Sequence, residues 1–146
     1  ARRRAAGPDK QRGIFRHRSA TGVCYFYAMA GVGMLRLASR KTREKRVVRE
    51  HHRLLAALQG SLADGSGPVD ERLRAALAAT PRSQLTGPCG AHLRLYVSFW
   101  AHRWVGRPLC TPSFPLADAG ALERGLQAWR RLREARASLT AAQRSS

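Results

Sequence analysis

The chain has 146 residues and a formal net charge of +18 at pH 7, from 27 Lys and Arg residues against nine Asp and Glu residues. This length suffices for one domain, but so high a charge exceeds what a freely soluble small domain normally carries. Only three of the basic residues are lysines, and the arginine fork suits phosphate and stacks on bases. We therefore expect an anionic partner and favour a nucleic acid over an anionic membrane.

Residues 1–20 show no periodic pattern, and we expect them to be extended. The uncharged run that follows, residues 19–35, includes three glycines and has basic flanks on both sides. It falls short of a membrane span, so we expect no stable membrane insertion. We expect this apolar segment to pack on a neighbouring protein or on RNA, within a basic and apolar N-terminal extension that covers residues 1–39.

Between residues 39 and 60, apolar residues recur at spacings of three and four, which predicts an amphipathic helix that ends at Gly60. The other face of this helix is strongly basic and has only two acidic residues beside it, Glu44 and Glu50. Such a face is often simply solvated, but the shortage of acidic partners favours contacts with phosphate. The residues predicted to bind RNA here are Arg43, Lys45, Arg46, Arg49 and Arg53.

A second, shorter helix is predicted over residues 68–79. Pro68 suits the first turn of a helix, and Asp70 and Glu71 lie where the positive end of a helix favours acids. Leu73 and Leu77 would face the first helix, which gives a small helical hairpin. Pro81 ends this segment.

The stretch "LTGPCG" at residues 85–90 predicts a tight turn, because Gly87 and Gly90 enter positive φ freely and proline presets its own φ. The segment after the turn alternates like a strand but also fits a helix, and periodicity alone does not decide. Arginines interleaved with aromatic rings are typical of recognition of unpaired RNA, although the tryptophans could equally form a local core. The candidates are Arg82, Arg94 and Arg103 for RNA binding, and Tyr96, Phe99, Trp100 and Trp104 for aromatic packing or stacking.

Asp118 can cap a C-terminal amphipathic helix that runs to about residue 138. Apart from these short amphipathic stripes, the pattern shows no set of strands or long apolar segments that would close a sizeable core. We therefore expect a mainly α, non-globular chain: extended arms, a small helical hairpin, a glycine turn and an aromatic-basic segment, with little independent core. Such chains become ordered on a large partner surface.

The sequence contains no recognisable set of residues for catalysis or metal binding. The three cysteines (Cys24, Cys89, Cys110) lack the spacing of a zinc site, and we expect them to be ordinary small apolar residues of a reducing compartment. No nucleophile with its base, carboxylate pair or phosphate-binding loop is recognisable. We expect no catalysis, no cofactor, no metal and no small-molecule substrate.

The order of these elements resembles the fourteenth small-subunit ribosomal protein family, in its zinc-free form. The resemblance covers residues 40–114 and includes the basic helix "REKRVVREHHRLLAAL", the helix that starts "PVDERL", the junction "PRSQLTG" and the tail "TPSF". Ser98 and Arg103 keep the family's spacing, and Gly106 and Pro108 stand for its later Gly and Pro. The chain lacks the two arginines of the family's turn, and Phe99 and Trp104 replace an Arg and a Glu.

This resemblance implies a structural constituent of the ribosomal small subunit that binds rRNA of the subunit head and neighbouring head proteins. Long arms at both ends (1–39 and 115–146) imply a divergent mitochondrial member of the matrix ribosome, with the cytoplasmic ribosome of a high-GC organism as the alternative. A second class of function is a basic accessory subunit of an organellar membrane or respiratory complex. A DNA-packaging or viral basic protein shares the charge but gives no reason for the Leu-Thr-Gly junction.

Overall fold

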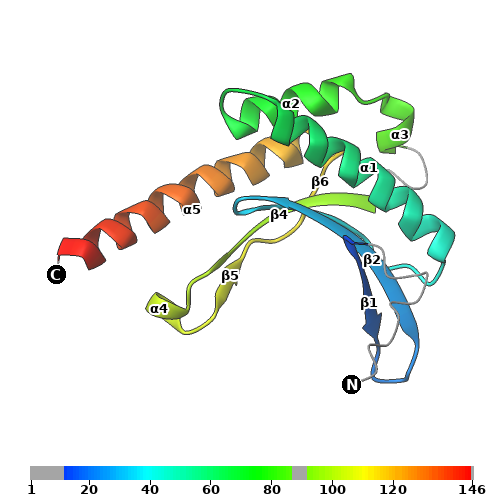
Figure 1. Ribbon diagram of the computed structural model, residues 1–146, viewed down its shortest axis with the longest axis horizontal. Helices are drawn as coiled ribbons and strands as arrows, with labels where there is room; N and C mark the ends of the chain where they lie inside the picture. The colour runs from blue at the N-terminus through cyan, green and yellow to red at the C-terminus, as the bar shows by residue number, and fades with distance from the viewer. Residues whose placement is uncertain (1–11, 87–91, 146) are drawn as a thin grey trace, which may run out of the picture.

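The computed structural model describes residues 12–86 and 92–145, and these residues form six strands and five helices (Figure 1). In chain order the elements are β1 Ile14–Arg18, β2 Cys24–Val32, β3 Leu35–Ser39, α1 Lys45–Asp64, α2 Val69–Ala79, α3 Arg82–Thr86, β4 Leu93–Trp100, α4 His102–Val105, β5 Pro108–Cys110, β6 Phe114–Pro115 and α5 Ala119–Ser145.

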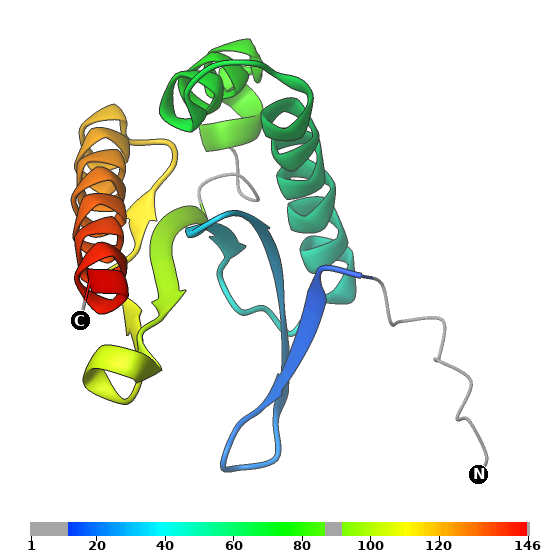
Figure 2. The same cartoon turned by 60° about the vertical axis from the view of Figure 1, so that its left-hand side comes forward.

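The strands form one antiparallel sheet in the order β1-β2-β3-β4-β5, and β6 also pairs with β4. The sheet is strongly curled. Figure 2 shows it as an arch, with α1 outside the limb that holds β2 and α5 outside the limb that holds β4. The two helices therefore cover the convex side of the sheet, and no helix of the described ranges covers the concave side.

This architecture corrects the expected fold class. The chain is neither mainly α nor non-globular: a curled sheet is its central element, and the sheet and its helices enclose a continuous core. The core includes fully buried leucines on the sheet and on the helices packed against it, among them Leu35, Leu37, Leu55, Leu73, Leu95 and Leu126. The chain therefore builds its own core and does not depend on a partner to bury these residues.

The uncharged run 19–35, for which no strand is predicted, holds most of a β-hairpin. Strand β2 has apolar side chains on both faces, so its period of two is hidden in the sequence. The hairpin turn is short: Gly33, with φ +58°, and Met34 connect β2 to β3. A residue with positive φ is needed at such a two-residue turn, which explains the glycine.

The two halves of the sheet repeat one arrangement. Strands β2 and β3 form a hairpin that is followed by α1, and β4 pairs with β5 and β6 before α5 follows. Each helix packs on the hairpin that precedes it. The β3–β4 ladder joins the halves, with Leu37 opposite Leu95. Strands from the expected N-terminal extension, residues 1–39, and strands from the later part of the chain therefore belong to a single sheet.

The two expected helices after residue 40 are present and pack against each other. Helix α1 continues through Gly60 to Asp64, because Leu62 is buried and extends the apolar stripe by one turn. The Arg72 guanidinium of α2 donates hydrogen bonds to the carbonyls of Leu62 and Gly65, which satisfies the last turn of α1.

The segment after the glycine turn and the C-terminal helix can also be compared with the predictions. The stretch 92–105, left open between strand and helix, is a strand over Leu93–Trp100 followed by the short helix α4. The expected C-terminal helix is present and longer than predicted, and the Asp118 carboxylate accepts a hydrogen bond from the Ala121 amide at its start (3.1 Å).

Candidate nucleic-acid interface

The concave side of the sheet carries the candidate site. Because side chains alternate along each strand, the residues that pair with one another across the ladders share a face. The face opposite the helices, called here the open face, comprises Phe15, His17, Tyr25, Tyr27, Met29, Arg36, Ala38, Arg94, Tyr96, Ser98 and Trp100. It combines four kinds of group: aromatic rings, arginines, one thioether and small polar side chains.

The curl of the sheet brings side chains of β2 and β4 into contact across β3. The Tyr96 hydroxyl donates to the Met29 sulfur at 3.0 Å, although a whole strand separates the two residues in the sheet. Arg36 lies opposite Tyr96 in the β3–β4 ladder, and its guanidinium donates to the Gly33 carbonyl at 2.6 Å. Tyr96, Met29 and Arg36 thus form the floor of the concave face.

Burial raises the pKa of the Tyr96 phenol, and the nearby Cys110 thiol raises it further, while the Arg36 charge opposes the shift. The direction of the pKa shift means that the phenol stays protonated at neutral pH and keeps its hydroxyl donor. The floor of the open face therefore presents a neutral hydroxyl and a positive guanidinium.

A second group of rings lies towards the edge strand. The Phe15 ring of β1 and the Tyr27 ring of β2 stack with centroids 5.4 Å apart and planes 20° apart. Phe15 is 40% exposed, and at the far end of β4 Trp100 is 76% exposed. Phe15 and Trp100 are therefore the candidate contact rings of the open face.

The sheet contains no negative charge. In the part of the chain that the structure describes, none of the six strands includes an Asp or a Glu, and the acidic residues lie on helices and loops. Arg36 and Arg94 are on the open face, and Arg103 and Arg107 follow at the end of β4. An anion that approaches this side of the molecule therefore meets positive charge without local repulsion.

The predicted RNA-binding residues lie on more than one surface. The basic residues of the first helix (Arg43, Lys45, Arg46, Arg49 and Arg53) are exposed along α1 or just before it, on the convex side of the sheet. Arg53 lies 3.4 Å from the Glu50 carboxylate, and Lys45 lies 5.9 Å from the centroid of the Phe26 ring. Arg82 is on α3, whereas Arg94 is on the open face and Arg103 is on α4.

The four predicted aromatic residues also lie on different surfaces, two on the open face and two against the core. Tyr96 and Trp100 are on the open face, and Phe99 is 7% exposed because it points into the core under the helices. Trp104 of α4 packs partly against that core. The predicted turn residues Gly87 and Gly90 lie outside the described residues, so their role stays a prediction.

Sequence reasoning missed the residues that β1, β2 and β3 contribute to the open face, namely Phe15, Tyr25, Tyr27, Met29 and Arg36. One signal could have found them. The stretch "YFYAMA" at residues 25–30 is rich in aromatic residues and alternates large with small side chains at its end, and the short run "IFRHR" precedes it across a polar turn that contains Gly22. Runs rich in aromatic and β-branched residues on both sides of a turn signal are typical of strands in a hairpin.

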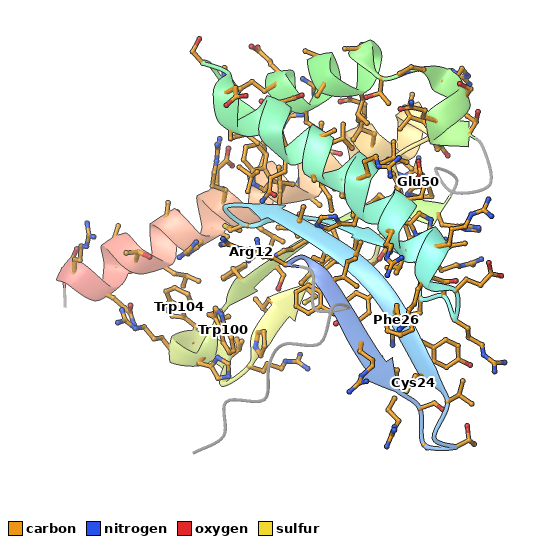
Figure 3. The ribbon with its side chains drawn as sticks, turned by 45° about the vertical axis from the view of Figure 1, so that its right-hand side comes forward. Arg12, Cys24, Phe26, Glu50, Trp100 and Trp104 are labelled. Carbon is orange, nitrogen blue, oxygen red and sulfur yellow. The ribbon has the colours of Figure 1, made fainter. Side chains whose placement is uncertain are left out.

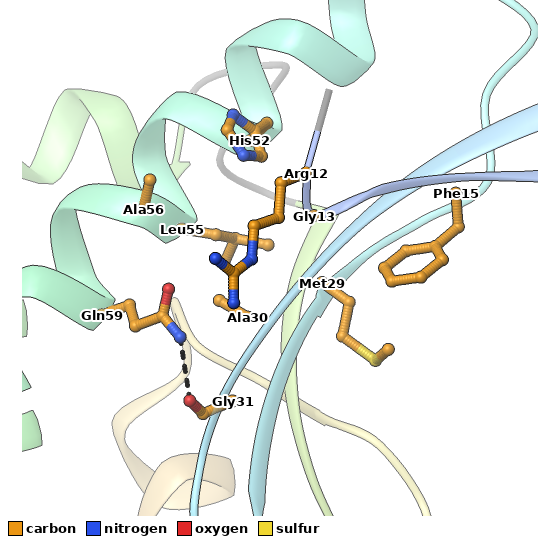
Figure 4. A pocket seen from close by; sticks show the side chains of 10 residues that line it. All are labelled: Arg12, Gly13, Phe15, Met29, Ala30, Gly31, His52, Leu55, Ala56 and Gln59. Carbon is orange, nitrogen blue, oxygen red and sulfur yellow. Dashed lines mark hydrogen bonds between the residues drawn. The ribbon is translucent and has the colours of Figure 1, made fainter. Parts of the chain in front are cut away.

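A hollow of about 440 Å³ between α1 and the start of β1 is a second, weaker candidate site (Figure 4). Figure 4 shows the Arg12 side chain inside this hollow, between His52 and Gln59, while Phe15 and Met29 point to the other side of the sheet. The Gln59 amide donates to the Gly31 carbonyl at 2.9 Å. Arg12, His52 and Gln59 thus supply much of the polar lining of this hollow.

Within the described ranges, no group of three or more His, Cys, Asp or Glu side chains could hold a metal ion. None of the helices in these ranges combines the length and apolar character that crossing a membrane requires. No protein-family model matches the chain, and no curated protein or solved structure is significantly similar to it. The candidate site is therefore interpreted from its own chemistry, and the ribosomal resemblance stays a prediction.

Proposed function

We propose that this protein binds nucleic acid through the open face. The observation that supports the proposal is the composition of that face: aromatic rings and arginines on a concave sheet whose described strands contain no acidic residue. Arginine tracks phosphate and aromatic rings stack on bases, which together are the requirements of a nucleic-acid contact.

The geometry favours a nucleic acid with unpaired bases. The rings of Phe15 and Trp100 are exposed at 40% and 76%, and an aromatic ring gains most from a base whose own face is free. In a duplex the base faces are already stacked on each other. We therefore propose single-stranded or irregular RNA as the first ligand class to test.

An rRNA of the small ribosomal subunit, in mitochondria, is the narrower form of this proposal. This narrower form rests on the sequence resemblance and the high positive charge alone. The sheet does not support it, because the fold that the resemblance implies has no such sheet. In this setting the open face would contact rRNA, and the basic side of α1 would contact a second segment of rRNA or a neighbouring head protein.

The test is equilibrium binding of the full chain to a single-stranded RNA, a single-stranded DNA and a duplex of the same length. Tyr25→Ala and Arg94→Gln change the open face, and Arg53→Gln removes the same charge from the convex side. We expect the Tyr25 variant to lower affinity for the single strand by about 1–3 kcal/mol, roughly 5- to 150-fold. Arg94→Gln should also reduce the salt dependence of binding.

Arg53→Gln should leave affinity for short single strands nearly unchanged. If instead only this variant weakens binding, the nucleic acid lies on α1 and the open face is not the site. A clear preference of the wild-type protein for the duplex would contradict the proposal that unpaired bases are recognised.

A further inference from the structure

A cleft lies between α4 and the C-terminal half of α5, where strand β4 ends. Its volume is about 540 Å³. Figure 3 shows Trp100 and Trp104 in the space between the two helices. The lining residues are Trp100, His102, Arg103, Trp104, Arg136 and Thr140.

One side of this cleft is aromatic. Trp100 is 76% exposed, and its ring lies 4.8 Å from the His102 ring at a tilt of 31°. Trp104 also lines the cleft, and its indole Nε1 is buried beneath the surface. The part of the aromatic wall that a ligand can reach is therefore the exposed Trp100 ring.

The cleft is also positively charged. Arg103 and Arg136 line it, and none of the described lining residues is acidic. The Arg136 guanidinium is 5.8 Å from the centroid of the buried Phe99 ring, a cation–π contact that ties this side chain to the end of β4. A second hollow of about 650 Å³, lined by Arg103, Thr140, Gln143 and Arg144, continues from the first along α5.

The acidic residues of α5 lie elsewhere. Glu123 and Glu134 line a separate hollow that also includes Arg130 and Arg131. The side of α5 that faces α4 thus has arginines and no acidic residue among the described lining residues of its two hollows. This asymmetry is what a phosphate group requires, because a carboxylate beside the site would cancel the attraction.

The cleft is continuous with the open face, because Trp100 belongs to both. Trp100 has the same orientation along β4 as Tyr96 and Ser98, and it is the last residue of the strand. We propose that the cleft holds one unpaired base of a bound nucleic-acid strand against Trp100, with the adjoining phosphate between Arg103 and Arg136. This inference rests on the proposed function and adds where the strand leaves the sheet.

The experiment uses the full chain and a single-stranded RNA of twelve nucleotides that carries one fluorescent adenine analogue, placed in turn at each end and in the centre. Stacking on an indole quenches such a base, so one end position should be quenched strongly on binding. Trp100→Ala should remove that quenching and weaken binding about tenfold, the effect expected when one stacked base is lost. Quenching that is equal at all positions, or that survives Trp100→Ala, would overturn the inference.

Arg136→Gln tests the phosphate contact, and Arg131→Gln on the other side of the same helix is its matched control. We expect weaker binding and a smaller salt slope for Arg136→Gln, and no change in either quantity for Arg131→Gln. Equal effects of the two variants would mean that only the net charge matters. Thermal unfolding of each variant shows whether the fold is intact, which the high exposure of Trp100 leads us to expect.

The two proposals fail differently. If Tyr25→Ala and Arg94→Gln weaken binding while Trp100→Ala and Arg136→Gln do not, the open face binds the strand and the cleft is not used. If Trp100→Ala and Arg136→Gln weaken binding while Tyr25→Ala and Arg94→Gln do not, the strand binds at the cleft and the rest of the open face is not the site. Absence of any RNA binding by the wild-type chain would contradict both.

Discussion

Gly125 of α5 lies directly against Leu95 of β4. A Cβ atom at Gly125 would be 2.6 Å from Leu95 Cδ2 and 3.0 Å from Phe114 Cδ2. Leu95 is fully buried and has no free space into which it can move, and Phe114 is half-buried beside it. We expect Gly125→Ala to overpack the interface between α5 and the sheet and to cost about 1–3 kcal/mol of the free energy of unfolding.

Gly120→Ala is the control for that prediction. It makes the same chemical change near the start of the same helix, where a Cβ would meet its nearest neighbour, Asp118 Oδ1, at 3.4 Å. This variant should be neutral or slightly more stable, because alanine favours a helix over glycine by about 1 kcal/mol. Denaturant unfolding of both variants checks the pair; equal stabilities would mean that α5 does not pack on β4 as closely as described.

The ion pair between α2 and α5 predicts a dependence of stability on pH. The Arg74 guanidinium donates to the two Glu123 carboxylate oxygens at 2.7 and 2.9 Å, and this lowers the pKa of Glu123. A lowered pKa means that the contribution is present above the pKa of the unfolded chain and is lost as pH falls through the folded-state pKa. We expect Glu123→Gln to lower the melting temperature slightly at neutral pH.

The difference in melting temperature between wild type and Glu123→Gln should close as the solution becomes acidic, because protonated glutamate and glutamine then behave alike. Glu134→Gln, on the same helix, serves as the comparison. The Arg74 and Glu123 side chains are 37% and 51% exposed, so the effect should be small and should shrink in high salt. A difference that persists at low pH would assign the effect to packing and not to charge.

The turn between β2 and β3 depends on the conformation of Gly33. Its φ of +58° lies in the left-handed region, and no atom within 4 Å would contact a Cβ there. We therefore expect backbone strain alone to decide the outcome: Gly33→Val should cost about 1–2 kcal/mol, and Gly33→Asn should cost less, because asparagine tolerates this conformation. Thermal unfolding measures both, and similar losses would show that the residue type at this turn is unimportant.

The stack of Phe15 on Tyr27 connects stability with binding. Tyr27→Ala should lose the stacking energy of about 0.5–1.5 kcal/mol and weaken binding of single-stranded RNA. Tyr27→Phe keeps the ring and should preserve both properties. The measurement is unfolding and RNA affinity of the two variants side by side; if Tyr27→Phe binds as weakly as Tyr27→Ala, the hydroxyl matters and stacking is not the main contribution.

The three long helices could be predicted from the sequence, and the pairing of the strands into one sheet could not. Helices α1, α2 and α5 have one apolar stripe each, and that stripe is visible as a period of three and four. Strand β2 buries Ala28 and Ala30 on one face and presents Tyr27 and Met29 on the other, and both faces count as apolar in a hydropathy pattern. The sequence therefore showed an uncharged run there and not a strand.

Only part of the open face was among the predicted residues, because a local pattern shows one strand at a time. Tyr96, Trp100 and Arg94 were recognised because β4 carries arginines and aromatics in one short stretch. Their partners on β1 and β2 come from a region more than sixty positions earlier, and only the β2–β3–β4 pairing brings Tyr27 and Met29 towards Tyr96. Register between distant strands depends on tertiary packing, which a local pattern does not record.

The β3–β4 ladder also determines how the chain can fold during synthesis. Strand β3 is complete early, but its partner strand follows only after α1, α2 and α3. Until β4 has left the ribosome that makes it, the nascent chain holds a strand with an unpaired edge, and Leu37 has not yet met Leu95. Contacts between such distant residues form slowly, and an open strand edge invites association with other chains. A chaperone that shields the open edge of β3 during this interval would therefore increase the yield of folded protein.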